Sequence, residues 1–191
     1  AELLFPVFQT IWEQEKLPDD WLQGILIKIP KKGDLSNCNN WRGITLLSIP
    51  SKVLAKVILN RITHKIDETM RKEQAGFRAG RSCIDQINSL RIIIEQMTEM
   101  NNPLHICFID YEKAFDRVSR SSIWQALEKR NVPPKLIALI RSLYDGYVTK
   151  VLHSGNLSAP FSTRSGVRQG CILSPILFLC AIDEILQSAL D

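Results

Sequence analysis

The sequence predicts an α+β fold in which helices pack on a small antiparallel sheet, and three patterns predict it. Apolar and polar residues alternate along residues 24–30, which is typical of a half-buried strand. Apolar residues recur every four positions along residues 54–66, which gives a helix one buried face. Residues 149–153 and 161–163 flank a turn region at 154–159 and predict a hairpin.

In chain order, the expected elements of the first half are a helix over residues 1–16, strands over 24–30 and 44–47, and a helix that begins near Ser51. Pro30 ends the first strand, and Lys31-Lys32-Gly33-Asp34 after it forms a basic turn. Ser51 after Pro50 is the expected N-cap of the helix.

The expected elements of the second half are a helix from Ser82, a buried strand over 104–109, helices over 121–130 and 135–145, the hairpin, and a last helix from Ser174. Ser82 has Asp85 at its third position, close to a capping box. The helix that follows is expected to bury the stripe Ile87, Leu90, Ile94 and Met97. Ser174-Pro175 gives the last helix an N-cap and a first-turn proline.

Positive charge is concentrated between residues 28 and 81, where 12 Lys and Arg stand against 4 Asp and Glu, although the 191-residue chain carries only +4. This split is expected when one part of a protein binds phosphate and another holds a metal ion. A solvated basic surface without a ligand is the alternative.

The composition excludes several classes of protein. The N-terminus carries no basic region of a secretory signal, and no apolar run is long enough to cross a bilayer. The five cysteines are scattered without metal-type spacing, which indicates reduced thiols in an intracellular protein. The absence of an initiator Met suggests a fragment of a longer chain.

Two aspartates follow the apolar run of residues 104–109. Asp110 ends the expected strand, and a carboxylate there needs a positive partner, for which a divalent metal ion is a strong choice. Asp116 stands after Phe115 and is expected to cap or orient the next helix rather than to bind metal. The alternative for Asp110 is a turn former or a helix cap.

A loop over residues 74–82 combines two glycines, Phe77, Arg78 and Arg81. Glycine lets a backbone approach a ligand closely, and Arg and Phe can bind phosphate or stack on bases. Intramolecular pairing of the arginines with an acid is the alternative.

Four segments together resemble the reverse transcriptase domain of non-LTR (LINE-type) retrotransposons. They are IPKKGD…NWRGITLLS, QAGFRAGRS, FIDYEKAFDRV and GVRQGCILSPILF, in that family's order between residues 21 and 186. The resemblance implies a right-hand polymerase fold, with fingers and the N-terminal helix in residues 1–103 and an incomplete N-terminal palm in residues 104–191. It implies a polymerase that adds deoxynucleotides to a primer 3′ end by two-metal phosphoryl transfer.

The resemblance also implies roles for individual residues. Asp110 matches a catalytic, metal-binding aspartate, helped by the carbonyl of Tyr111, and Phe115 matches the aromatic that excludes a ribose 2′-hydroxyl, with core packing as its alternative. The matches to nucleotide-binding positions are Lys31 or Lys32, Arg42, Gln169 and Gly170. The matches to template-binding positions are Phe77, Arg78 and Arg81.

The family's second metal-binding motif, an Ala-Asp-Asp hairpin, does not occur in the sequence. We therefore expect one wall of a site for two Mg²⁺ ions, with Mn²⁺ as a substitute, and no polymerase activity from this chain alone. The implied partners are an RNA template, a DNA primer, dNTPs, a C-terminal palm and thumb, and an endonuclease domain elsewhere in a polyprotein, with no membrane.

Two other functions compete with this one: a degenerate module that binds RNA without catalysis, and an unrelated basic α+β domain. For the cellular compartment, nucleus and cytoplasm both stay open.

Overall fold

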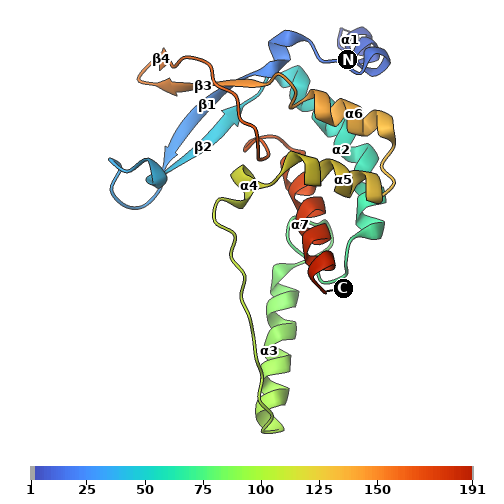
Figure 1. Ribbon diagram of the computed structural model, residues 1–191, viewed down its shortest axis with the longest axis vertical. Coiled ribbons are helices and arrows are strands. Elements are labelled where there is room, and N and C mark those ends of the chain that lie inside the picture. The colour runs from blue at the N-terminus through green and yellow to red at the C-terminus, as the bar shows by residue number, and fades with distance from the viewer. Residues whose placement is uncertain (1–2, 191) are drawn as a thin grey trace.

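The computed structural model describes residues 3–190 and has the expected α+β architecture (Figure 1). Its sheet has the order β2-β1-β3-β4, formed by Gln23–Pro30 (β1), Trp41–Leu46 (β2), Val148–His153 (β3) and Asn156–Leu157 (β4). The sheet is mixed rather than antiparallel, because β3 joins β1 in parallel while the β1–β2 and β3–β4 pairs are antiparallel. A parallel pair needs a long crossover connection, and the helices between β2 and β3 supply it.

The helices are Phe5–Gln14 (α1), Ile49–Thr69 (α2), Cys83–Glu99 (α3), Ala114–Arg117 (α4), Arg120–Lys129 (α5), Pro134–Ser142 (α6) and Ser174–Leu190 (α7). Short 3₁₀ turns occupy Asp19–Leu22 and Cys38–Asn40. No helix in the part of the chain that the structure describes is long and apolar enough to cross a membrane.

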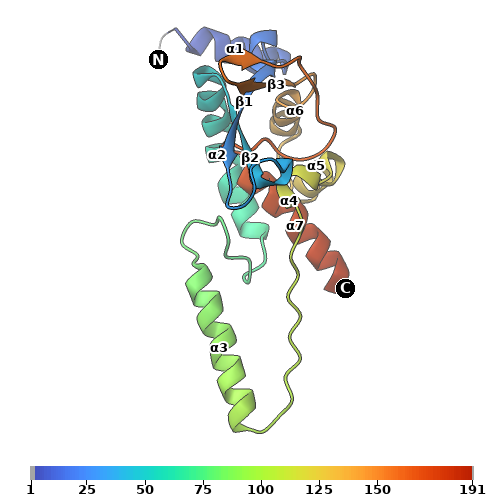
Figure 2. The same cartoon turned by 90° about the vertical axis from the view of Figure 1, so that its left-hand side faces the viewer.

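The main core lies where α2, α5, α6 and α7 meet beside the sheet (Figures 1 and 2). Residues spaced four apart in α2, from Leu54 to Ile66, are buried as the periodicity predicted. The helix begins earlier than expected, because the hydroxyl of Ser48 accepts a hydrogen bond from the Ser51 amide at 3.3 Å, so Ser48 rather than Ser51 is the N-cap. Ser174 likewise lies inside α7, and its hydroxyl donates to the Arg168 carbonyl at 2.6 Å instead of capping the helix.

The third helix, α3, projects from the rest of the molecule, and an extended segment returns from it to α4 (Figures 1 and 2). Ser82 caps α3 as predicted, with its hydroxyl accepting from the Ile84 amide at 3.1 Å. The predicted core stripe is wrong for this chain, since α3 has no buried residue and Ile87 is 67% exposed. Helical periodicity marks an apolar face, but only a neighbouring element can bury it.

The strand predicted over residues 104–109 is also wrong for the described structure. These residues are extended without belonging to a strand, and Phe108 and Ile109 are 81% and 65% exposed. A β-strand exists through hydrogen bonds to a neighbour, and none of the four described strands pairs with this segment. Asp110 therefore ends an exposed extended segment rather than a buried strand.

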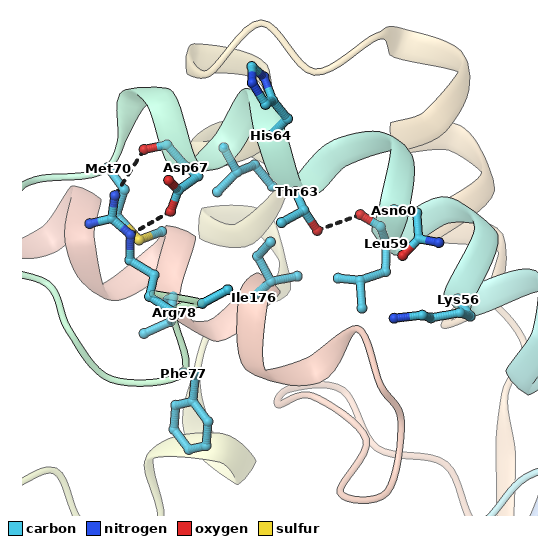
Figure 3. A pocket seen from close by; sticks show the side chains of 13 residues that line it. Lys56, Leu59, Asn60, Thr63, His64, Asp67, Met70, Phe77, Arg78 and Ile176 are labelled. Carbon is cyan, nitrogen blue, oxygen red and sulfur yellow. Dashed lines mark hydrogen bonds and ion pairs between the residues drawn. The ribbon is translucent and has the colours of Figure 1, made fainter. Parts of the chain in front are cut away.

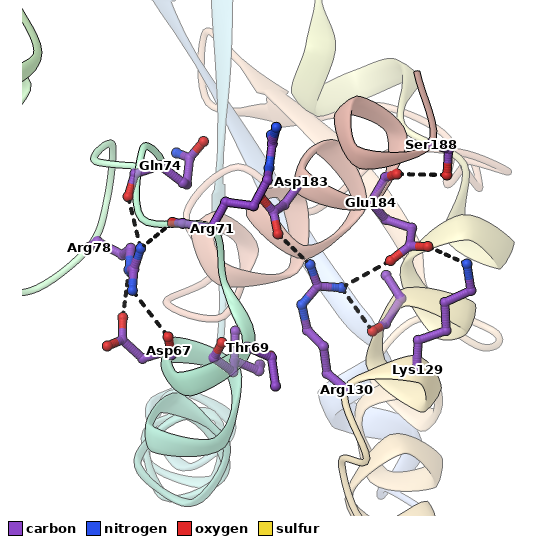
Figure 4. A network of polar contacts seen from close by, with 12 residues as sticks. Asp67, Thr69, Arg71, Gln74, Arg78, Lys129, Arg130, Asp183, Glu184 and Ser188 are labelled. Carbon is purple, nitrogen blue, oxygen red and sulfur yellow. Dashed lines mark hydrogen bonds and ion pairs between the residues drawn. The ribbon is translucent and has the colours of Figure 1, made fainter. Parts of the chain in front are cut away.

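A buried ion-pair network joins three distant segments (Figure 4). Asp183 of α7 is fully buried and accepts from Arg71 Nε at 2.8 Å and from Arg130 at 2.7 Å. Arg130 also lies 3.5 Å from Glu184, which pairs with Lys129. The sequence analysis missed this network, although an aspartate within the apolar stripe of the last helix was a visible signal.

Candidate functional site

Gln169 connects two segments that are far apart in the sequence. Its side-chain amide donates to Asp116 Oδ1 at 2.8 Å, and its main-chain carbonyl accepts from the Thr45 amide in β2 at 2.7 Å. The loop before it also contacts this region, because the Ser165 hydroxyl donates to the Asp116 carbonyl at 3.0 Å. Three of the sequence segments singled out above therefore meet at one place.

Glycine is required at two positions where the loop approaches its neighbours. Gly170 has φ +110°, and a Cβ there would lie 2.5 Å from the Thr45 carbonyl oxygen. Gly166 has φ +80°, and a Cβ there would lie 2.6 Å from the Asp116 carbonyl oxygen. Both positions combine a left-handed backbone with contact to main-chain atoms, which a side chain would prevent.

A cavity of about 400 Å³ lies beside this junction. Its wall includes the side of β1 and β2, through Lys28 and Trp41, and the opposite loop, through Gln169. Lys28 Nζ lies 4.4 Å from the Trp41 ring centre. The cavity therefore offers a ligand hydrogen-bonding groups, a positive charge and an aromatic face.

Phe115 lies in an aromatic cluster. It stacks on Phe178 of α7 at 4.5 Å between ring centres, and Phe77 meets it edge-on at 6.2 Å. Phe115 is partly buried against the core, whereas Phe77 is 71% exposed and has φ +54°. The packing alternative for Phe115 is thus present in the structure, and the ring also stands one residue from the Asp116–Gln169 bond.

Asp116 does not cap the following helix. Its carboxylate binds Gln169, and the N-cap of α5 is Ser119, which makes no side-chain capping bond. The expected capping role of Asp116 is therefore wrong, because the loop after β4 places the Gln169 amide within reach of its carboxylate. That Asp116 orients the helix stays a prediction.

Asp110 and Tyr111 are both exposed. Over residues 3–190, no three His, Cys, Asp or Glu side chains are grouped so that they could hold a metal ion. Nearby Glu112 pairs with Arg117 at 3.3 Å. Since Mg²⁺ favours six oxygen ligands, the described residues alone do not form a site for it.

The predicted triphosphate-binding cations belong to the hairpin formed by β1 and β2 and the turn that connects them. Arg42 is exposed on β2 opposite Ile29, and Lys32 is exposed in the connecting turn. Lys31 Nζ donates to the Asn39 carbonyl at 3.2 Å. Lys113 donates to the Asn39 side chain at 2.9 Å and so ties this turn to the loop before α4, a contact that sequence reasoning missed.

The predicted template-binding arginines differ from each other. Arg78 donates to the Asp67 carboxylate at 2.6 Å and to the Asp67 carbonyl, and 7% of its side chain is exposed (Figure 3). It also donates to the carbonyls of Arg71 and Gln74 (Figure 4). The bond to its carboxylate holds the pKa of Asp67 below its usual value. The intramolecular pairing that was the alternative for Arg78 is therefore present in the structure, whereas Arg81 is exposed.

A groove of about 540 Å³ lies between α2 and the loop that carries Phe77 and Arg78 (Figure 3). Its apolar floor includes Leu59 and Ile176, and Lys56 lies at its edge. Arg78 helps to form this groove by holding the loop against the end of α2.

Residues 29–191 match the family model described as "Reverse transcriptase (RNA-dependent DNA polymerase)". The chain is 31% identical over 180 residues to the "Transposon TX1 uncharacterized 149 kDa protein" of Xenopus laevis. This match covers 94% of this chain and 14% of that protein. It is 32% identical over 175 residues to the "Retrovirus-related Pol polyprotein from type-1 retrotransposable element R2" of Popillia japonica, covering 90% of this chain and 24% of that protein. This chain thus spans at most a quarter of these relatives.

Among solved structures, the fold is similar to apo telomerase from Candida tropicalis truncated from its C-terminal domain. The TM-score is 0.63 at 16% identity, over 90% of this chain and 39% of that one. The similarity supports the α+β fingers and palm architecture.

Proposed function

Because this chain belongs to the reverse transcriptase (RNA-dependent DNA polymerase) family, we propose that it forms part of an RNA-directed DNA polymerase of a non-LTR retrotransposon. In this proposal residues 1–103 are the fingers with the N-terminal helix, and residues 104–191 are the first part of the palm. The substrates are an RNA template, a DNA primer and dNTPs, and the reaction is phosphoryl transfer to the primer 3′ end. We expect the enzyme to work inside the cell, in the nucleus or the cytoplasm.

The junction at Gln169 is the observation that supports the proposal best. It joins the loop of residues 165–170 to β2 and to the residue that follows Phe115. The exposed cations Lys32 and Arg42 belong to the adjoining β1–β2 hairpin. The cavity beside the junction is lined by the Trp41 ring, the Lys28 cation and the Gln169 amide, groups that suit the base, phosphates and sugar of a nucleotide. Phe115, Lys32 and Arg42 are not among its lining residues.

The residues of this junction would act by binding and orientation. Gly170 leaves room for a close approach, and Gln169 can donate and accept hydrogen bonds. Arg42 stands between Trp41 and Gly43 of β2, which line the cavity, so its side chain lies on the other face of the sheet. In this proposal Arg42 would bind phosphate outside the cavity through its fork of donors. Arg81 and Phe77, both exposed, remain candidates for contact with the template. Phe115 is the candidate for excluding a 2′-hydroxyl.

Polymerases of this family generally use divalent metal ions. Asp110, with the carbonyl of Tyr111, would hold Mg²⁺ or Mn²⁺ only together with carboxylates from outside the described residues. We therefore expect the purified 191-residue chain to incorporate no nucleotides. Primer extension on RNA by this chain alone, lost in Asp110→Ala, would contradict that expectation.

The direct test measures dNTP incorporation by the longer protein that contains this chain, on a primed RNA template. Asp110→Ala should lower the rate by at least about 100-fold, because the carboxylate would hold the metal ion that stabilises the charge developing on the phosphate. Glu112→Gln is the matched control, since Glu112 is an exposed acid two residues away whose partner is Arg117. Equal rates for the two variants would refute the role of Asp110.

Phe115→Val tests the sugar gate in the same assay. A smaller side chain should raise the use of rNTPs relative to dNTPs by roughly 10- to 200-fold, the range for removing one steric contact in a pocket. Unchanged selectivity, together with lower stability from the lost stacking on Phe178, would leave Phe115 with a packing role alone.

A further inference from the structure

Arg168 immediately precedes the Gln169–Gly170 turn and is one of the few buried cations of the described chain. Only 5% of the residue is exposed, and its three side-chain nitrogens lack a hydrogen-bond partner within the structure. Buried charges are normally paired with an opposite charge. An arginine in this environment therefore needs an explanation that packing alone does not give.

The guanidinium of Arg168 lies over two aromatic rings. Its central carbon is 4.9 Å from the Tyr144 ring centre and 4.6 Å from the Tyr147 ring centre. Both tyrosines are buried, and burial raises the pKa of each hydroxyl above its ordinary value. Cation–π attraction is strongest in such a dry environment, so the two rings hold the side chain in place.

The main chain of Arg168 is fixed as well. Its carbonyl accepts from the Ser174 hydroxyl at 2.6 Å and from the Cys171 amide at 3.0 Å, at the start of α7. The side chain reaches the corner between α6 and β3, where Tyr144 and Tyr147 lie. Arg168 thus joins the start of α7 to the connection between α6 and β3.

The next two residues depend on that anchorage. Gln169 bonds to Thr45 and Asp116, and Gly170 lies so close to Thr45 that a Cβ would come within 2.5 Å of its carbonyl oxygen. A small displacement of Arg168 would therefore break the Thr45–Gln169 hydrogen bond or push the turn against β2.

We propose that Arg168 is a positioning residue, which uses its stacking on Tyr144 and Tyr147 to hold the Gln169–Gly170 turn at the nucleotide site. The consequence for nucleotide binding rests on the proposed function, whereas the placement of the turn does not. The positive charge is the essential feature, because an uncharged side chain of similar length would fill the same space without the attraction to both rings.

Amide hydrogen exchange of the 191-residue chain tests the placement directly. The Thr45 amide, which donates to the Gln169 carbonyl, should exchange roughly tenfold faster in Arg168→Met than in the wild type. The amides of Ile58 and Ile62 in the α2 core should change by less than about twofold, which separates a local effect from general destabilisation. Arg141→Met is the matched control, since Arg141 lies over the Trp124 ring at 5.7 Å, away from the turn.

Arg168→Lys tests the need for charge. A buried lysine loses its proton more readily than an exposed one. In Arg168→Lys, the Thr45 amide should exchange at nearly the wild-type rate at low pH, where the lysine is protonated. The ratio of its exchange rate to that of the wild type should rise as the pH rises. In Arg168→Met, this ratio should stay high at every pH. Unchanged Thr45 exchange in Arg168→Met, or equal acceleration of Thr45, Ile58 and Ile62, would overturn the proposal.

Nucleotide incorporation by the longer protein gives the functional measurement. Arg168→Met should raise the KM for dNTPs by roughly tenfold, with a smaller effect on kcat, because the turn would contact the nucleotide in the ground state as well as during reaction. A changed Thr45 exchange without polymerase activity in the wild type would refute the proposed function and leave the positioning role standing. Normal KM with accelerated exchange would show that the turn does not contact the nucleotide.

Discussion

The buried ion pair at Asp183 gives the sharpest test of how α7 is held in the fold. Asp183→Asn keeps the shape of the side chain but removes the charge that faces Arg71 and Arg130 (Figure 4). Two charge-assisted hydrogen bonds, at about 1.5–3 kcal/mol each, would be weakened or lost. The Arg71 side chain is 25% exposed and can regain part of its bonding from water, whereas that of Arg130 is 5% exposed and cannot.

The free energy of unfolding should therefore fall by about 3–5 kcal/mol, as when one partner of a buried ion pair is removed. Urea unfolding at neutral pH, followed by tryptophan fluorescence, measures this loss. Glu128→Gln is the matched control, since Glu128 pairs with Arg141 at 2.9 Å with more than half of its own side chain exposed. An exposed pair of this kind contributes about 1 kcal/mol or less.

A double variant shows whether the loss comes from the unpaired charge. Asp183→Leu combined with Arg130→Met replaces most of the pair with apolar groups, and it should be more stable than Asp183→Asn. If Asp183→Asn loses no more stability than Glu128→Gln, the network does not hold α7 in place and the reasoning is refuted.

Three further predictions concern pH, thiol reactivity and the glycine turn. Bonding to Arg78 lowers the pKa of Asp67 in the folded state, so its contribution to stability is present above about pH 3.8 and is lost as the pH falls. The stability difference between wild type and Asp67→Asn, measured by urea unfolding, should therefore shrink with acidification; a constant difference would contradict this. Burial raises the pKa of the Cys180 thiol to about 12, so native protein near neutral pH should resist its alkylation. Mass spectrometry should find label first on the exposed thiols, which are Cys38, Cys83 and Cys107. Gly170→Ala should lower the free energy of unfolding by about 1–3 kcal/mol, because φ +110° and the Thr45 carbonyl both oppose a Cβ; an unchanged urea midpoint would show that the turn can shift freely.

Local patterns were sufficient for most elements of the fold. The alternation along residues 24–30 became β1, and the four-residue spacing along 54–66 became the buried face of α2. Ser82 caps its helix as predicted. These features depend on residues close together in the chain, which is why the sequence reveals them. The order of four motifs likewise indicated the family that the comparisons show.

The sequence did not reveal what each apolar face or charged group would meet. The stripe on α3 is a real helical pattern, yet none of its residues is buried in the structure, and residues 104–109 lack a described neighbour with which to form a strand. Arg78 fitted a phosphate contact by its motif, but the end of α2 places Asp67 beside it.

Periodicity and motif order determined most of the helices, the first two strands and the family of this protein from the sequence alone. Only the tertiary structure decided that Asp183 lies between two arginines, that Asp116 binds Gln169, and that the cation of Arg168 is held by tyrosine rings. The physical reason is that the helical and strand patterns act over a few residues. Burial, ion pairing and strand pairing depend instead on partners brought together from distant parts of the chain.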